Sequence, residues 1–94
     1  MLIKTMEKKM NFNDLNEYLV YRNEKPNHNV EYIYKFDNGF GVSLVKTNDG
    51  YDVQTLQWDY DNSDFYVNVK PVDSIKSYTA PYVLLQFLET IKDK

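Results

Sequence analysis

The chain has 94 residues, enough for one domain, and it contains one histidine and no cysteine. The sequence therefore excludes disulfides, cysteine nucleophiles and the common zinc sites, and no apolar run reaches the roughly 20 residues of a membrane helix. Aromatic residues make up 16% of the chain, which indicates a folded core rather than disorder. Because small secreted domains usually depend on disulfides, the composition favours the cytoplasm.

Charge is distributed unevenly along the chain. The net charge is −3, but residues 31–66 combine two lysines with seven carboxylates, which gives this stretch a net charge of −5. Such a field repels nucleic acid and attracts basic surfaces. The sequence therefore predicts no direct contact with nucleic acid and favours a basic protein as partner.

The first elements expected are a head and a short helix. Residues 1–10 are expected to form a flexible head unless something docks on it, because chain ends are poorly ordered when they are not held in place. Residues 13–22 predict a helix, with Asn13 as its N-cap and Pro26 preventing its continuation. The helical spacing is seen only in one narrow stripe of residues, formed by Leu15, Tyr18, Leu19 and Arg22.

The middle of the chain predicts an antiparallel meander. Four alternating or β-prone runs are separated by turn-forming residues, and two of the turns contain Asn-Gly or Asp-Gly. Alternation places every second side chain of each run on one face of the sheet. The four strands are expected at residues 30–36, 40–46, 51–58 and 64–69.

The end of the chain predicts a second helix. Pro71 ends the last strand, and the helix follows with Thr79 as its cap and Pro81 in its first turn. Its buried stripe is expected to consist of Leu84, Phe87, Leu88 and Ile91. The fold class is therefore α+β: a single domain over residues 1–94, with a β-meander of about four strands, a short N-terminal helix and a C-terminal helix packed on the sheet.

Few residues are suited to catalysis. His28 lies in a Pro- and Asn-rich linker, which indicates a solvated loop residue. Gly39 and Gly41 form a G-x-G, but phosphate-binding loops need a third glycine followed by a helix, and here a strand follows. The sequence contains no nucleophile–base set, so we expect neither an enzyme nor a cofactor.

Three carboxylates, Asp59, Asp61 and Asp64, have a spacing like that of calcium ligands. An EF-hand loop needs glycine at its sixth position and glutamate at its twelfth, and these positions hold Asp64 and Lys70. We therefore expect no metal site. The simplest interpretation of the run is an exposed acidic turn.

A second interpretation concerns residues 58–66, WDYDNSDFY, called here the acidic-aromatic segment. Its four aromatic residues cannot all be buried beside three aspartates, and exposed aromatic residues are enriched at protein interfaces. In this interpretation the three aspartates would meet lysine or arginine side chains of a partner. Trp58, Tyr60 and Tyr66 would be the anchors.

The run F-D-N-G-F-G-V-S at residues 36–43 resembles a hairpin of small uncharacterised proteins from bacteriophages and prophages of Gram-positive bacteria. Those proteins typically carry F-x-N-G-[YF]-G-x-S, a further strand pair and a C-terminal amphipathic helix. Residues 69–75 and 84–91 resemble the later parts, and the likeness covers about residues 33–92. The stretch after Gly50 departs from that pattern. The resemblance implies a mobile-element origin and assigns no site residues.

Two functional hypotheses follow. The first is a phage accessory protein that binds and inhibits a host defence nuclease, in the manner of an anti-CRISPR or another DNA-mimicking inhibitor. Its motivation is the small size, the acidic middle, the acidic-aromatic segment and the resemblance. The alternative is a structural phage protein that assembles with itself, for example as a homodimer, through a free sheet edge.

Overall fold

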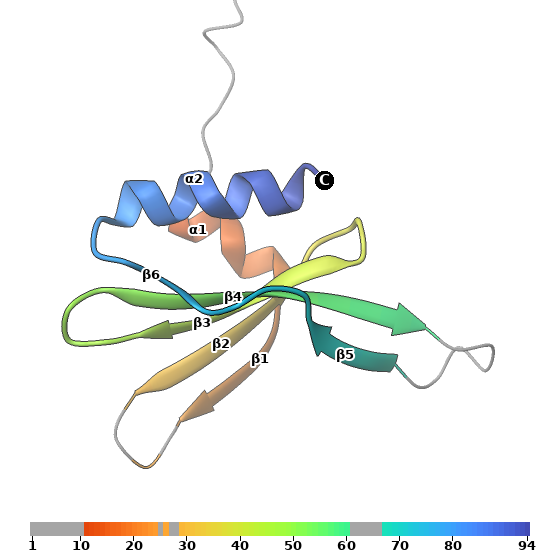
Figure 1. Cartoon of the computed structure of the whole chain (residues 1–94), viewed down its shortest axis with the longest axis horizontal. Helices are drawn as coiled ribbons and strands as arrows, with labels where there is room; N and C mark the ends of the chain where they lie inside the picture. The colour runs from red at the N-terminus through yellow and green to blue at the C-terminus, as the bar shows by residue number, and fades with distance from the viewer. Residues whose placement is uncertain (1–10, 25, 27–28, 61–66) are drawn as a thin grey trace, which may run out of the picture.

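The computed structural model describes residues 11–24, 26, 29–60 and 67–94. Its centre is an antiparallel meander in which β2 (Val30–Lys35) pairs with β3 (Phe40–Lys46) and β3 pairs with β4 (Tyr51–Tyr60) (Figure 1). The tight β2–β3 turn requires Gly39, which has a φ of 86° that side-chain-bearing residues rarely adopt. The predicted hairpins are confirmed, and β4 extends two residues beyond the predicted end.

The N-terminal helix is shorter than predicted: the helix expected over residues 13–22 is α-helical only to Leu15, continues as a 3-10 helix to Tyr18 and is wrong from Leu19 onward. The observed elements are α1 (Phe12–Leu15), a 3-10 turn, η2 (Asn16–Tyr18), and the strand β1 (Leu19–Glu24). The N-cap is Asn11 rather than Asn13, and it forms a capping box with Asp14. Residues 19–24 form a strand instead of a helix because their backbone pairs with β2. The Leu-Val-Tyr run at the start of this stretch contains residue types that suit a strand.

The other side of β4 is shared by two strands. The C-terminal half of β4 pairs with β5 (Val67–Pro71), and its first three residues pair with β6 (Lys76–Tyr78). The described sheet therefore has six strands instead of about four, with β1 and β6 unforeseen. Of the strand predicted over residues 64–69, residues 67–69 lie in β5, and the remainder lies outside the described residues.

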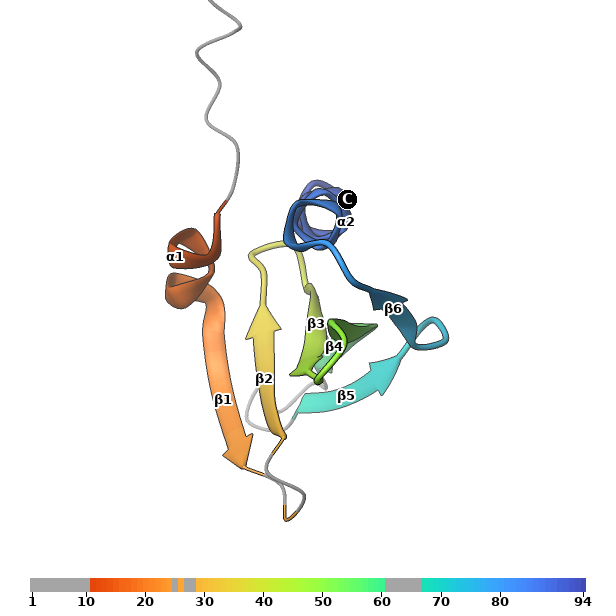
Figure 2. The same ribbon diagram turned by 90° about the vertical axis from the view of Figure 1, so that its left-hand side faces the viewer.

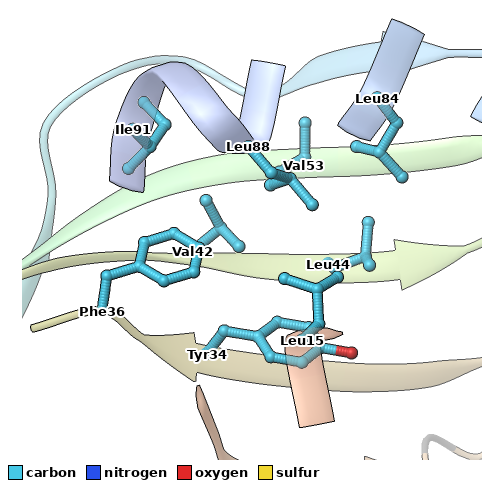
Figure 3. Packing of buried hydrophobic residues seen from close by; sticks show 9 residues of the cluster. All are labelled: Leu15, Tyr34, Phe36, Val42, Leu44, Val53, Leu84, Leu88 and Ile91. Carbon is cyan, nitrogen blue, oxygen red and sulfur yellow. The ribbon is translucent and has the colours of Figure 1, made fainter. Parts of the chain in front are cut away.

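The helix α2 (Pro81–Lys92) covers one face of the sheet, as predicted, and lies above β3 while α1 lies above β1 (Figure 2). It begins with Pro81 as expected, but its N-cap is Ala80, which makes no side-chain cap, rather than Thr79. Phe87 of the predicted stripe is half-buried. The core joins both helices to the sheet through nine residues: Leu15, Tyr34, Phe36, Val42, Leu44, Val53, Leu84, Leu88 and Ile91 (Figure 3).

The predicted α+β class with a helix packed on an antiparallel sheet is confirmed. The core is continuous, since residues from α1, β2, β3, β4 and α2 belong to one cluster. In the part of the chain that the structure describes, no helix has the length and apolarity needed to cross a bilayer.

Candidate functional site

The β2–β3 turn and the end of β4 meet at one end of the sheet. The backbone N–H of Trp58 donates to the carbonyl oxygen of Gly39 at 2.9 Å. Asp37 belongs to this turn and is exposed, and Asp59 follows Trp58 in β4. The start of the acidic-aromatic segment therefore lies beside a second acidic turn. We call Asp37, Trp58 and Asp59 the acidic end.

Trp58 is only half-exposed, because its ring covers a glycine. A Cβ added to Gly41 would lie 2.7 Å from Cζ3 of Trp58 and would also meet the carbonyl oxygen of Tyr34. Gly41 is buried, so the ring is seated directly on the backbone of β3. A partner would meet only the remaining surface of this indole.

Asp59 points to the other face of β4. Val53 is in the core beneath α2, and alternation along the strand assigns Asp59 to that face and Trp58 to the opposite one. A carboxylate oxygen of Asp59 lies 2.9 Å from Nζ of Lys70 on β5. The two adjacent candidate residues therefore do not form one flat contact surface.

The other candidate residues are only partly placed. Tyr60 is the last residue of β4, where its backbone pairs with Val67 of β5. Asp61, Asp64 and Tyr66 lie outside the described residues, as does His28. The predicted role of the aspartates as contacts for a basic partner stays a prediction.

Basic residues also lie at the acidic end, and we did not predict them there from the sequence. Lys70 reaches Asp59 across the β4–β5 ladder, and Nζ of Lys94 lies 5.7 Å from the ring centroid of Phe40. The position of Lys70, directly after the predicted fourth strand, was a usable signal for a cross-strand partner. The pairing leaves less free negative charge at the acidic end than the sequence alone indicates.

Among the described residues, no three His, Cys, Asp or Glu side chains converge as a metal site would require. Two carboxylates of the sheet accept from serine hydroxyls: Ser43 donates to Glu31 at 2.6 Å, and Ser77 donates to Asp52 at 2.7 Å. Comparisons of the chain with protein-family models, with curated proteins and with solved structures find no match.

Proposed function

We propose that this protein is a non-catalytic binding protein that uses its acidic end to occupy a basic, nucleic-acid-binding surface of a second protein and so inhibits it. The observation that carries the proposal is the hydrogen bond from Trp58 to Gly39. It holds the turn that carries Asp37 beside the end of β4, the strand that carries Asp59.

The charge of the central strands supports this proposal. Between residues 31 and 60 the described chain carries five carboxylates against Lys35 and Lys46. A surface of this sign disfavours phosphate and accelerates encounter with a basic protein. Half-exposed Trp58 would add apolar contact at the edge of such an interface.

The resemblance at residues 36–43 supports a particular setting for this binding. A phage or prophage accessory protein would act in the cytoplasm of its bacterial host, and a defence nuclease is a host protein with a large basic groove. The carboxylates would then take positions that DNA or RNA phosphates occupy in the free nuclease. This is the DNA-mimicking mechanism applied to this chain.

The first experiment is affinity capture of the tagged full chain from a lysate of a Gram-positive bacterium, washed at low and at high salt. Recovery of a nuclease that is lost at high salt supports the proposal, because contacts between exposed charges are screened. The captured nuclease is then assayed for cleavage with and without the protein. Capture without inhibition contradicts the proposal.

Charge variants test the surface itself. Changing Asp59, Asp61 and Asp64 together to lysine should weaken capture by at least about tenfold, since each exposed charge contact contributes up to about 1 kcal/mol. The matched control changes three exposed carboxylates away from the acidic end, Glu17, Glu24 and Asp49, to lysine. Equal losses in both triple variants would show that only the net charge matters.

The variant Lys70→Gln is expected to change inhibition in the opposite direction. It removes the ammonium that lies 2.9 Å from Asp59 and leaves this carboxylate available to a partner. Inhibition should become stronger than that of the parent chain. Weaker inhibition by Lys70→Gln would place the contact on the lysine rather than on the aspartate.

One observation favours self-assembly as a second candidate function. The edge strand β1 has a neighbour on one side only among the described strands, and Val20 and Tyr21 on it are 55% and 54% exposed. Such an edge can pair with a second copy. Sedimentation velocity over a wide concentration range tests this, with Val20→Lys as the disrupting variant. A monomer at every concentration would exclude it.

A further inference from the structure

A groove lies at the other end of β4 from the acidic end, on the face of the sheet that carries α2. It has a volume of about 350 Å³ and is lined by residues of α1, η2 and three strands. An adjoining hollow of about 260 Å³ shares Tyr32 and Lys46 with it. The combined space lies in the range of small-ligand sites.

The walls of the groove are aromatic and rich in hydrogen-bond donors. Tyr32, Tyr34 and Tyr51 line it together with Phe12, whose ring stacks on that of Tyr51 with centroids 5.9 Å apart. Burial, with a smaller effect of neighbouring Tyr32, raises the pKa of Tyr34, so its phenol stays protonated at physiological pH. Tyrosine hydroxyls can donate to a ligand while the rings offer apolar contact.

The groove also holds two asparagine side chains that are not used elsewhere among the described residues. Asn13 and Asn16 line it, and among the described residues their side chains have no hydrogen-bond partner. Each side chain offers two N–H donors. No aspartate or glutamate of the described chain lines either hollow.

Lys46 is the residue that decides the charge of the groove. It is exposed and, unlike that of every other described basic residue, its side chain has no ion pair, hydrogen bond or ring contact within the described part of the chain. The other six, Arg22, Lys35, Lys70, Lys76, Lys92 and Lys94, all have such an interaction. An uncompensated ammonium at a donor-rich groove favours an anion.

From these observations we infer that the groove binds a small anion with an aromatic body, its phosphate or carboxylate held by Lys46 and its ring placed against the tyrosines. A nucleoside monophosphate and an aromatic carboxylate share this chemistry. The site is independent of the proposed function, because it lies at the opposite end of β4 and has the opposite local charge.

The test is titration of the full-length protein, labelled with ¹⁵N, with single probes while NMR amide shifts are followed. The probes are nucleoside monophosphates, benzoate, an unphosphorylated nucleoside, inorganic phosphate and a short single-stranded oligonucleotide. We expect shifts at Tyr32, Lys46, Tyr51 and the side-chain amide of Asn16 with the monophosphates or with benzoate. Which of these two kinds of probe produces the shifts distinguishes a nucleotide from an aromatic carboxylate. The nucleoside and the inorganic phosphate should each bind at least about tenfold more weakly.

Point variants distinguish a specific contribution of Lys46 to binding from an effect of the net charge of the protein. Lys46→Gln should weaken binding about tenfold and Lys46→Arg should retain it, while the control Lys76→Gln, whose lysine pairs with Asp73 outside the groove, should leave affinity unchanged. Asn16→Asp, which adds a negative charge with little change in size, should also weaken binding. A urea midpoint measured for each variant separates loss of binding from loss of folding.

Three results would overturn the inference. The first is the absence of shifts at the groove with every probe. The second is equal affinity of Lys46→Gln and the parent chain. The third is much tighter binding of the oligonucleotide than of any monophosphate, which would assign the groove to a nucleic-acid strand instead.

Discussion

The side-chain amide of Asn38 donates to the carbonyl oxygen of Ile91 at 2.9 Å, although the two residues are 53 positions apart. It also reaches the carbonyl oxygens of Lys92 and Lys94, and its own Oδ1 accepts the N–H of Phe40 at 3.0 Å. The last carbonyls of a helix have no partner within the helix. One turn residue therefore closes the β2–β3 hairpin and caps the end of α2.

Asn38→Ala should lower the free energy of unfolding by about 1–2 kcal/mol, because it removes these bonds. Asn38→Asp should lower it at least as much, because it places a negative charge at the negative end of the helix dipole. Urea unfolding followed by circular dichroism measures both. The control Asn48→Ala, at an exposed position of the β3–β4 turn, should change stability by less than about 0.5 kcal/mol.

Gly41→Ala should be far more damaging than Gly39→Ala. The added methyl at Gly41 would clash with the Tyr34 carbonyl and lie 2.7 Å from Trp58, which should cost about 3 kcal/mol or more. At Gly39 nothing lies within 4 Å, and only the positive φ is unfavourable, at about 1–2 kcal/mol. Trp58 is the single tryptophan, so its fluorescence reports the displacement directly. Equal losses in the two variants would contradict the seating of the indole on β3.

Thr55→Val should leave stability unchanged or raise it by up to about 1 kcal/mol. Thr55 is 3% exposed, and its hydroxyl has no hydrogen-bond partner in the described structure, so the folded state gains nothing from it. Valine has the same shape without the polar group. The control Thr55→Ser keeps the hydroxyl and loses a methyl group, and it should be less stable than the parent by about 1 kcal/mol. Thermal unfolding ranks the three proteins.

The stability of the protein should decrease at alkaline pH through Tyr34. Burial, and secondarily the neighbouring Tyr32, raises the pKa of Tyr34 above its ordinary value. The unfolded chain then loses this proton at a lower pH than the folded chain. Its contribution is therefore complete below a pH of about 10 and is lost as the pH rises from there through the raised pKa.

Urea midpoints measured from neutral pH upward test this dependence with two matched variants. Tyr34→Phe should show a smaller alkaline decrease than the parent chain. Tyr82→Phe, at a position that is 67% exposed, should follow the parent profile. Identical slopes in all three proteins would mean that Tyr34 does not account for the decrease.

The sequence predicted those parts of the fold whose signals are local. Asn-Gly and Asp-Gly turns between alternating runs predicted the β2–β3–β4 meander, and the apolar stripe with Pro81 at its start predicted α2. Each signal acts within a few residues, where turn geometry and side-chain period are decided. The same locality made residues 13–22 ambiguous, because one narrow stripe fits a helix as well as the start of an edge strand.

The tertiary structure decided everything that depends on which segments meet. Pairing with β2 turned residues 19–24 into a strand, and pairing with β4 produced the three-residue strand β6. For the candidate site, the ladder partners decided that Asp59 is paired with Lys70, and the fold left Lys46 beside an aromatic groove. Composition and charge are properties of the chain itself, but burial, pairing and uncompensated charge arise only when distant residues become neighbours.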